Sequence, residues 1–242
     1  MADDQKLYSI WVYLQAEPLF WLTLTIGAYL VGDFCYRRSG LFPLFNPVAL
    51  GIIIVSSVLL LFDIQYERYF DGAKFIHFLL GPATVALAIP IYRKWDLILD
   101  HGRAILTTVV LGSCFAILIT WGLASAFGLE REIVLSLMPR SVTAPIAMGV
   151  SEIIGGIPSL TAIITIITGI IGAAFATFTL DLLRVKKMSA RGFAIGLASH
   201  GIGTARAMSR NETAGVFAAV AMGLSGIVTA LIVPLMIFLL RI

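Results

Sequence analysis

Charged residues are scarce in this 242-residue sequence, where Asp, Glu, Lys and Arg together make up only 13%. Soluble domains carry about 25% charged residues. Here 59% of the residues are hydrophobic and the mean hydropathy is +0.97, which excludes an ordinary soluble domain. The net charge of +3 comes from short loops and not from a long basic run, so a nucleic-acid partner is also excluded. We therefore predict an all-α, polytopic membrane protein whose surroundings are the lipid bilayer.

Cysteine and histidine are scarce too. Cys35 and Cys114 lie far apart without metal-ligand spacing, so both are predicted to be apolar core residues. The sequence has no nucleophile elbow and no phosphate loop, and we expect no enzyme activity, catalytic residue, metal or cofactor. The N-terminal segment has no basic region before an apolar core, so no cleaved signal or transit peptide is expected. The three histidines are too scattered to form a catalytic set: His77, His101 and His200.

Long uncharged stretches predict about six full transmembrane helices. The third of them is interrupted by a Gly-Pro pair. Two further segments, 131–157 and 190–210, are too polar or too short for an ordinary span, and we expect them to be interrupted or re-entrant. The six predicted spans are 18–36, 39–62, 75–92, 104–129, 158–180 and 213–240.

The stretch 138–161 breaks helical continuity at what should be bilayer depth. It contains Arg140, Glu152 and a Gly-Gly pair at 155–156. Proline removes a backbone donor and clashes with the preceding turn, and an unsatisfied backbone group in hydrocarbon costs several kcal/mol. Broken polar backbone is tolerated there only when it is buried in protein or lines a cavity, so this stretch is predicted to form a functional site. Its prolines are Pro139, Pro145 and Pro158.

Lysine and arginine concentrate in the segments 36–41, 92–103 and 182–191, which are predicted to be cytoplasmic. The segment 131–157 must then enter and leave the membrane on the outer side. For 190–210 two alternatives remain open. It forms a hairpin from the cytoplasmic side, or it crosses completely and moves the C-terminus inside.

A weak internal repeat agrees with the predicted interrupted segments. The segment 46–51 resembles 144–149, and 81–84 loosely resembles 201–204, in the same order along the chain. Paired interruptions in two halves are typical of secondary transporters built from inverted repeats. We therefore expect one transmembrane transport domain, with the following bounds: 1–242 for the domain, 18–102 for a possible first repeat and 103–242 for a possible second repeat.

Four long strings are distinctive: His77 to Pro90, Pro139 to Met148, Gly155 to Thr161 and Ala198 to Ala207. They resemble the LrgB/CidB family, and in particular its enterobacterial inner-membrane members. The resemblance is close from about residue 75 onwards and loose over the first two spans. At Phe175-Ala176 and Ser225 the sequence departs from the glycine and asparagine of many members, so no shared role is assigned there.

The resemblance implies two alternative functions. Bacterial members are described as holin- or antiholin-like modulators of murein hydrolase export and autolysis that act with a small LrgA/CidA-like membrane partner. Others carry glycolate and glycerate in plastids or are linked to pyruvate uptake, which points to proton-coupled transport of small 2-hydroxy or 2-keto monocarboxylates. We expect a homo-oligomer in the bacterial inner (plasma) membrane. The midplane polar residues favour the carrier, because a holin needs closely packed helices and not paired broken segments.

Arg140 is the centre of the predicted substrate site. A carboxylate needs fixed donors, and a helix N-terminus supplies N–H groups with a partial positive charge. Ser141 and Thr143 precede the second half of the broken segment, where Arg140 can offer a bidentate fork. The alternative is that Arg140 snorkels to the outer interface.

A second donor cluster lies at 200–204, where glycines permit close backbone approach to a ligand. No strand precedes it and a third glycine is missing, so it is not a dinucleotide fingerprint. The candidate substrate-binding residues here and elsewhere are His200, Gly201, Gly203, Thr204, Arg206, Asn46 and Thr84.

Each of these candidates has a structural alternative. His200 also suits helix packing and Arg206 also suits interfacial snorkelling. The side chains of Asn46 and Thr84 also suit local helix caps. Glu152 and His77 are the candidate proton carriers for coupling, with an outer-surface position as the alternative for Glu152.

Overall fold

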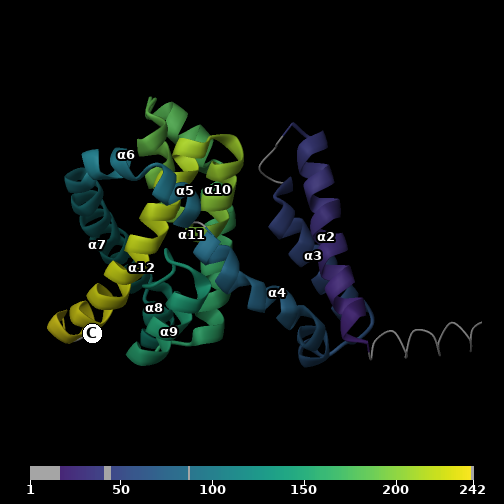
Figure 1. Cartoon of the computed structure of the whole chain (residues 1–242). Helices are drawn as coiled ribbons and strands as arrows, with labels where there is room; N and C mark the ends of the chain where they lie inside the picture. Colours follow the sequence, from purple (N-terminus) through teal and green to yellow (C-terminus); the bar gives the residue numbers. More distant parts are fainter. Residues whose placement is uncertain (1–16, 41–44, 87, 241–242) are drawn as a thin grey trace, which may run out of the picture. The chain divides into compact units, whose positions relative to one another are not determined.

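The computed structural model consists of helices joined by short turns and loops in the part of the chain that it describes, which comprises residues 17–40, 45–86 and 88–240 (Figure 1). The chain forms two compact units that divide after Ala86. Within the described residues, four helices are long and apolar enough to cross a bilayer, so the protein is a polytopic, all-α membrane protein. These helices are α2 (Pro18–Arg38), α7 (Gly102–Ala126), α10 (Pro158–Leu182) and α12 (Glu212–Leu240).

The first unit contains α2, α3 (Pro47–Leu61) and α4 (Tyr66–Ala86). The predicted span 39–62 contains α3, which begins at Pro47, where Asn46 caps the helix by accepting from the amides of Val48 and Ala49. α2 packs closely on α4 at Gly72, where an added Cβ would overlap the main chain of α2. The predicted third span is divided between α4, which continues through its internal proline, and the next short helix.

The second unit contains the remaining helices, with α7, α10 and α12 as its long members. Helices of 25 residues are about 38 Å long, which exceeds the ~30 Å of bilayer hydrocarbon. The shorter elements are α5 (Ala88–Arg93), α6 (Trp95–Asp100), α8 (Arg131–Leu137), α9 (Ala144–Ile154) and α11 (Met188–Arg210).

α8 and α9 form the re-entrant hairpin predicted for 131–157. They have 7 and 11 residues, so their lengths of about 10 and 17 Å are too short to cross. Two hydrogen bonds join the last turn of α8 to the start of α10. The hydroxyl of Ser136 accepts from the amide of Ile157 at 2.7 Å, and the hydroxyl of Thr161 donates to the Ser136 carbonyl at 3.0 Å. Gly155, with a φ of 82°, ends α9 in the left-handed region.

α11 is a second hairpin. His200 has φ 39° and ψ −132° inside it, and the chain turns back there. An added Cβ on Gly203 would lie 3.0 Å from the carbonyl oxygen of Ile195, eight positions earlier, which a continuous helix does not allow. Of the two alternatives that the sequence left open for 190–210, the structure has the hairpin.

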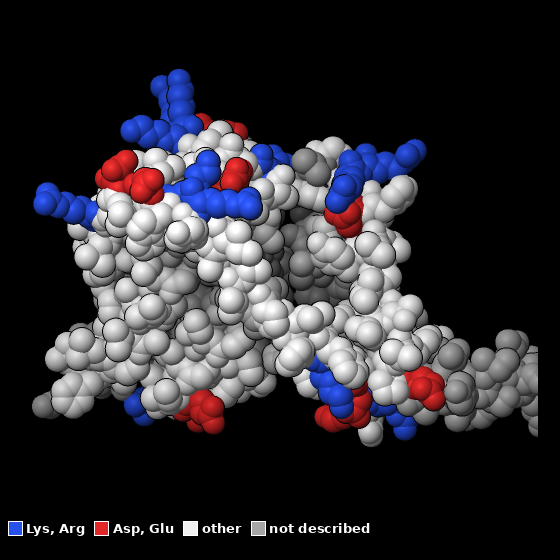
Figure 2. Space-filling model, viewed as in Figure 1, with Lys and Arg blue, Asp and Glu red and all other residues white. Residues whose placement is uncertain are grey.

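The two hairpins enter the second unit from opposite ends. α11 begins where α10 ends, and α12 leaves from that same end, whereas α8 and α9 adjoin the start of α10. Figure 2 shows Lys and Arg side chains gathered at one end of this unit. By the positive-inside rule this basic end is predicted to be cytoplasmic. Its basic residues include Arg93, Lys94, Arg103, Arg184, Lys186, Lys187, Arg191 and Arg210.

A polar layer interrupts the core of the second unit at mid-depth. Along α7, Val109 belongs to one hydrophobic cluster and Ile117 to another, and the buried Ser113 lies between them. Thr165 of α10 and His200 of α11 are also buried. Buried polar side chains are costly without partners, so their concentration at one depth indicates a functional site in this part of the unit.

Candidate functional site

Arg140 occupies the tip of the α8–α9 hairpin and points into the unit. Its Nε donates to the hydroxyl of Thr120 on α7 at 3.2 Å, and its Nη1 donates to the hydroxyl of Thr168 on α10 at 3.4 Å. Thr168 lies near the middle of α10, about 15 Å from the start of that helix. A guanidinium has five N–H donors, and these two contacts leave three for a ligand. The side chain therefore joins two transmembrane helices and does not extend along the hairpin towards its outer ends.

The same tip presents the N-terminus of α9. Ser141 and Thr143 lie in the turn before it, both half-buried, and the Thr143 hydroxyl does not cap the helix. The first amides of α9 therefore keep their donor capacity and their partial positive charge. The guanidinium of Arg140 and the N-terminus of a half-helix lie at the same tip, and both groups suit an anion.

His200 occupies the tip of the second hairpin, with 4% of its surface exposed. Its Nε2 lies 2.9 Å from the carbonyl oxygen of Thr165 on α10, so Nε2 carries the proton. The close approach depends on Gly169, where an added Cβ would lie 2.5 Å from the imidazole ring. The hydroxyl of Thr204 donates to the His200 carbonyl at 2.7 Å and holds the first turn after the break.

The second arm of α11 begins at Gly201, so a second half-helix N-terminus lies at this tip. Gly203 lets this arm pack directly against the first arm. The structure thus brings Arg140 and His200 to α10 one turn apart, at Thr168 and Thr165, with the predicted residues 141, 143, 201, 203 and 204 on the same two hairpins.

Three buried hydroxyls at this depth have no hydrogen-bond partner among the described residues: Ser113, Thr165 and Ser199. An unsatisfied buried hydroxyl in a native protein calls for an explanation, such as water or a ligand. Ser199 lies against Gly172 of α10, so it adjoins the His200 contact. These hydroxyls add polar capacity beside the two tips.

Sequence reasoning missed the threonines on α10 and α7 that receive the two tips. The signal for the threonine on α10 was present in the helical spacing of Thr161, Thr165 and Thr168, which is followed on the same face by Gly169 and Gly172. A polar and small face within an uncharged span indicates packing against something other than lipid.

The other predicted residues lie elsewhere. Asn46 caps α3 in the first unit, which is the structural alternative for it. Thr84 and His77 belong to α4, and their side chains are outside the described ones. Glu152 is exposed in the last turn of α9, away from both tips. Arg206 lies further along α11 and donates to the carbonyl oxygen of Ala173.

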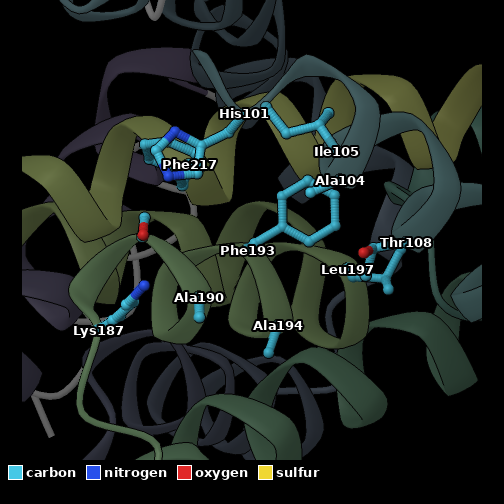
Figure 3. Close-up of a pocket in the computed structure, with 11 residues that line it drawn as sticks. His101, Ala104, Ile105, Thr108, Lys187, Ala190, Phe193, Ala194, Leu197 and Phe217 are labelled. Carbon is cyan, nitrogen blue, oxygen red and sulfur yellow. The ribbon is translucent and has the colours of Figure 1, made fainter. Parts of the chain in front are cut away.

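A separate cavity of about 300 Å³ lies between α7, the first arm of α11 and α12 (Figure 3). In this view His101 and Lys187 lie towards one side, with Ile105 and Leu197 towards the other. Its walls are largely apolar and include Phe193 and Phe217. The cavity suits hydrocarbon better than a small carboxylate, so the hairpin tips are the better candidate for an anion.

Sequence similarity to known proteins identifies the family of the chain. The model of the LrgB-like family matches residues 25–239 of the chain. The chain belongs to the LrgB-like family. The LrgB-like chain is 36% identical over 221 residues to the uncharacterized protein YxaC of Bacillus subtilis, covering 91% of this chain and 96% of YxaC.

Two further relatives carry a functional name. The antiholin-like protein LrgB of Bacillus mycoides is 33% identical over 218 residues, covering 90% of this chain and 95% of the relative. The antiholin-like protein LrgB of Bacillus cereus gives the same values of identity and coverage. No solved structure matches the LrgB-like chain significantly.

Proposed function

We propose that the chain is a secondary transporter of small 2-hydroxy or 2-keto monocarboxylates, of the glycolate, glycerate, pyruvate or lactate type, with proton-coupled uptake. The observation that carries this proposal is the meeting of two opposed hairpins at mid-depth of α10. Arg140 is on one tip and His200 on the other. Secondary transporters bind substrate near the bilayer midplane between discontinuous helices.

The tips also explain why the substrate should be an anion. Each hairpin returns through a half-helix, and both half-helices start at a tip with their positive dipole ends, at Ala144 and Gly201. Arg140 adds a full positive charge there. A single carboxylate balances this charge, and the hydroxyl or keto oxygen of the substrate can use the neighbouring threonine and serine hydroxyls.

Opposed hairpins suit alternating access, because each one separates the tips from one side of the bilayer. Movement of one hairpin away from α10 opens the tips to its own side, while the other hairpin keeps the second side closed. Glu152 and His77 stay the candidate proton carriers for the coupling.

The second candidate function is that of an antiholin-like protein that modulates murein hydrolase export and autolysis. The names of the Bacillus mycoides and Bacillus cereus relatives favour it. The two functions are compatible when altered carboxylate flux is the cause of an autolysis phenotype. In either case we propose a homo-oligomer in the bacterial inner (plasma) membrane, with a small LrgA/CidA-like membrane protein as partner.

The deciding experiment measures uptake of labelled glycolate, pyruvate and lactate into liposomes that contain the purified protein, with and without an imposed proton gradient. We expect saturable uptake that Arg140→Gln weakens and Arg103→Gln leaves unchanged, since Arg103 is an exposed arginine in the first turn of α7. Leakage of unrelated solutes without saturation would overturn the carrier in favour of a pore. An absence of flux that persists with the small partner present would also overturn it.

A further inference from the structure

The apolar cavity of about 300 Å³ between α7, the first arm of α11 and α12 has one polar end. His101, Lys187 and Ser189 line this end, which belongs to the basic end of the second unit. Figure 3 shows His101 and Lys187 towards one side of the cavity, and Ile105 and Leu197 towards the other. None of the described residues that line the cavity is acidic. The cavity is therefore amphipathic, with its positive charge at one end.

The cavity is a groove that opens at the surface between α7 and the first arm of α11. Exposed alanines line this opening, Ala104 on α7 and Ala190 and Ala194 one turn apart on α11. The floor consists of Phe193 and Phe217, which are buried and belong to one hydrophobic cluster. Small side chains at the rim and aromatic rings at the floor leave a slot that suits hydrocarbon.

The length of the groove matches one leaflet of a bilayer. It follows α7 from His101 to Thr108, which is about 10 Å along the helix axis. Further along, α7 and α11 close together, because an added Cβ on Gly112 would lie 2.5 Å from the side chain of Leu197. Half of the bilayer hydrocarbon is about 15 Å thick. A chain that enters the groove at the basic end therefore stays within the leaflet on that side.

The polar end of the groove suits a phosphate group. Lys187 is exposed there and, in the described part of the chain, pairs with no carboxylate. Arg191, one turn later, differs in that it pairs with Asp181 at 2.7 Å. His101 Nδ1 lies 2.8 Å from the Leu97 carbonyl oxygen, so Nδ1 carries the proton and Nε2 is left for a further contact. The ammonium of Lys187 is a point charge of the kind that binds phosphate.

We propose that this groove binds one anionic phospholipid from the leaflet at the basic end, with an acyl chain against Phe193 and Phe217 and the phosphate at Lys187. The inference does not rest on the proposed transport function. Charge complementarity favours a lipid over a second copy of the chain, because an apolar slot with one cationic end matches a hydrocarbon chain with one anionic head. Lys and Arg side chains gather at this end of the unit (Figure 2), and such residues attract anionic lipids.

A lipid in this groove would contact α7, α12 and the first arm of α11 together. The first arm already packs closely on α12 at Gly192 and Gly196, where an added Cβ would overlap the main chain of Ala214 and Ala218. The acyl chain extends this packing to α7. Because only the folded protein has the groove, a bound lipid stabilises the folded protein.

The first test measures lipid binding to the delipidated protein in detergent by native mass spectrometry. We expect one tightly held molecule of dioleoyl phosphatidylglycerol, and weaker binding of dioleoyl phosphatidylcholine, which has the same acyl chains but no net charge. Lys187→Gln should raise the dissociation constant for phosphatidylglycerol about fivefold. Lys186→Gln is the matched control, because Lys186 is exposed and adjacent but does not line the cavity. An equal effect of the two substitutions, or equal binding of the two lipids, would overturn the site.

The second test concerns the acyl chain. Ala194→Phe fills the groove and should weaken the binding of phosphatidylglycerol, whereas Ala126→Phe, at an exposed position that does not line it, should not. Phosphatidylglycerol should raise the midpoint of thermal unfolding of the unchanged protein and of Ala126→Phe, but not of Ala194→Phe. Displacement of the lipid by an equal concentration of glycerol phosphate would overturn a role for the acyl chain. If Ala194→Phe left lipid binding unchanged but altered the oligomeric mass, the groove would be a contact between protein chains and the lipid site would be overturned.

Discussion

Arg140 and His200 lie on hairpins that enter from opposite ends, yet they contact α10 one turn apart, at Thr168 and Thr165. α10 is therefore the helix that both hairpin tips contact. A helix with this role needs polar groups at its centre and small residues beside them, and α10 has both. The contacts between α10 and the two tips are accordingly the most informative ones to change.

Thr168→Val removes the hydroxyl that Arg140 Nη1 contacts at 3.4 Å and nearly keeps the side-chain volume. Because this bond is long, we expect its loss to cost about 1 kcal/mol, which is about a fivefold increase in the half-saturating substrate concentration. The measurement is initial uptake rate against concentration in liposomes. Thr168→Ser should behave as the unchanged protein does. Equal weakening by Val and Ser would show that the methyl group and not the hydroxyl matters.

Gly172→Ala tests the contact between α10 and the break in α11. The added Cβ would lie 2.1 Å from the Ser199 hydroxyl oxygen but 3.2 Å from the Ser199 Cβ. We expect overpacking of about 1–3 kcal/mol, seen as a lower midpoint of thermal unfolding in detergent. Ser199→Ala should restore most of this loss, because it removes the nearer atom, and the double-mutant cycle then reports a direct contact.

Two glycines serve as controls for that cycle. Gly122 of α7 and Gly223 of α12 have no atom within 4 Å of an added Cβ. Alanine at either position should leave the unfolding midpoint unchanged or raise it, since alanine favours helix over glycine by about 1 kcal/mol. If alanine at either position lowered the unfolding midpoint as much as Gly172→Ala does, the loss at Gly172 could not be assigned to its contact with Ser199.

The sequence predicted the outer hairpin at 131–157, left a hairpin at 190–210 as one of two alternatives, and did not predict what the tips touch. Prolines, paired glycines and Arg140 at bilayer depth mark broken backbone directly, because few other structures tolerate them there. Thr120 and Thr168 carry no such mark, since a threonine within a helix normally satisfies its hydroxyl on its own backbone. Their role depends on which helices pack together, which a single sequence does not specify.

The same difference, between features that the sequence marks and features that depend on helix packing, applies to the rest of the fold. The long uncharged spans and the outer hairpin at 131–157 follow from hydropathy and charge. The start of α3 at Pro47 follows from the cap at Asn46, and the two compact units follow from packing. For 190–210 both alternatives fitted the charge pattern. The decisive feature was the backbone of His200, which has positive φ although it is not glycine.

Thr161→Val tests how the outer hairpin is fixed to α10. The Thr161 hydroxyl donates to the Ser136 carbonyl at 3.0 Å and lies 2.8 Å from the Ser151 hydroxyl, and all three residues are buried. Removing it leaves buried acceptors without a donor, so we expect a loss of about 1–3 kcal/mol in thermal stability. Thr161→Ser should retain most of the stability. Thr179→Val, at an exposed position of the same helix, is the control and should have little effect.

The opposed directions of the hairpins predict that their bases are reached from different sides of the membrane. Gly155 lies at the outer end of α9, and Lys187 precedes α11 at the basic end. In a variant whose native cysteines are replaced by Ala, Gly155→Cys should react with an impermeant thiol reagent added outside intact cells, and Lys187→Cys should react only after the membrane is opened. If the two labelling patterns were exchanged, the orientation of the protein in the membrane would be opposite to the predicted one, but the hairpins would still enter from opposite sides. Reaction of both positions from the same side would contradict the opposed arrangement on which the site at Arg140 and His200 depends.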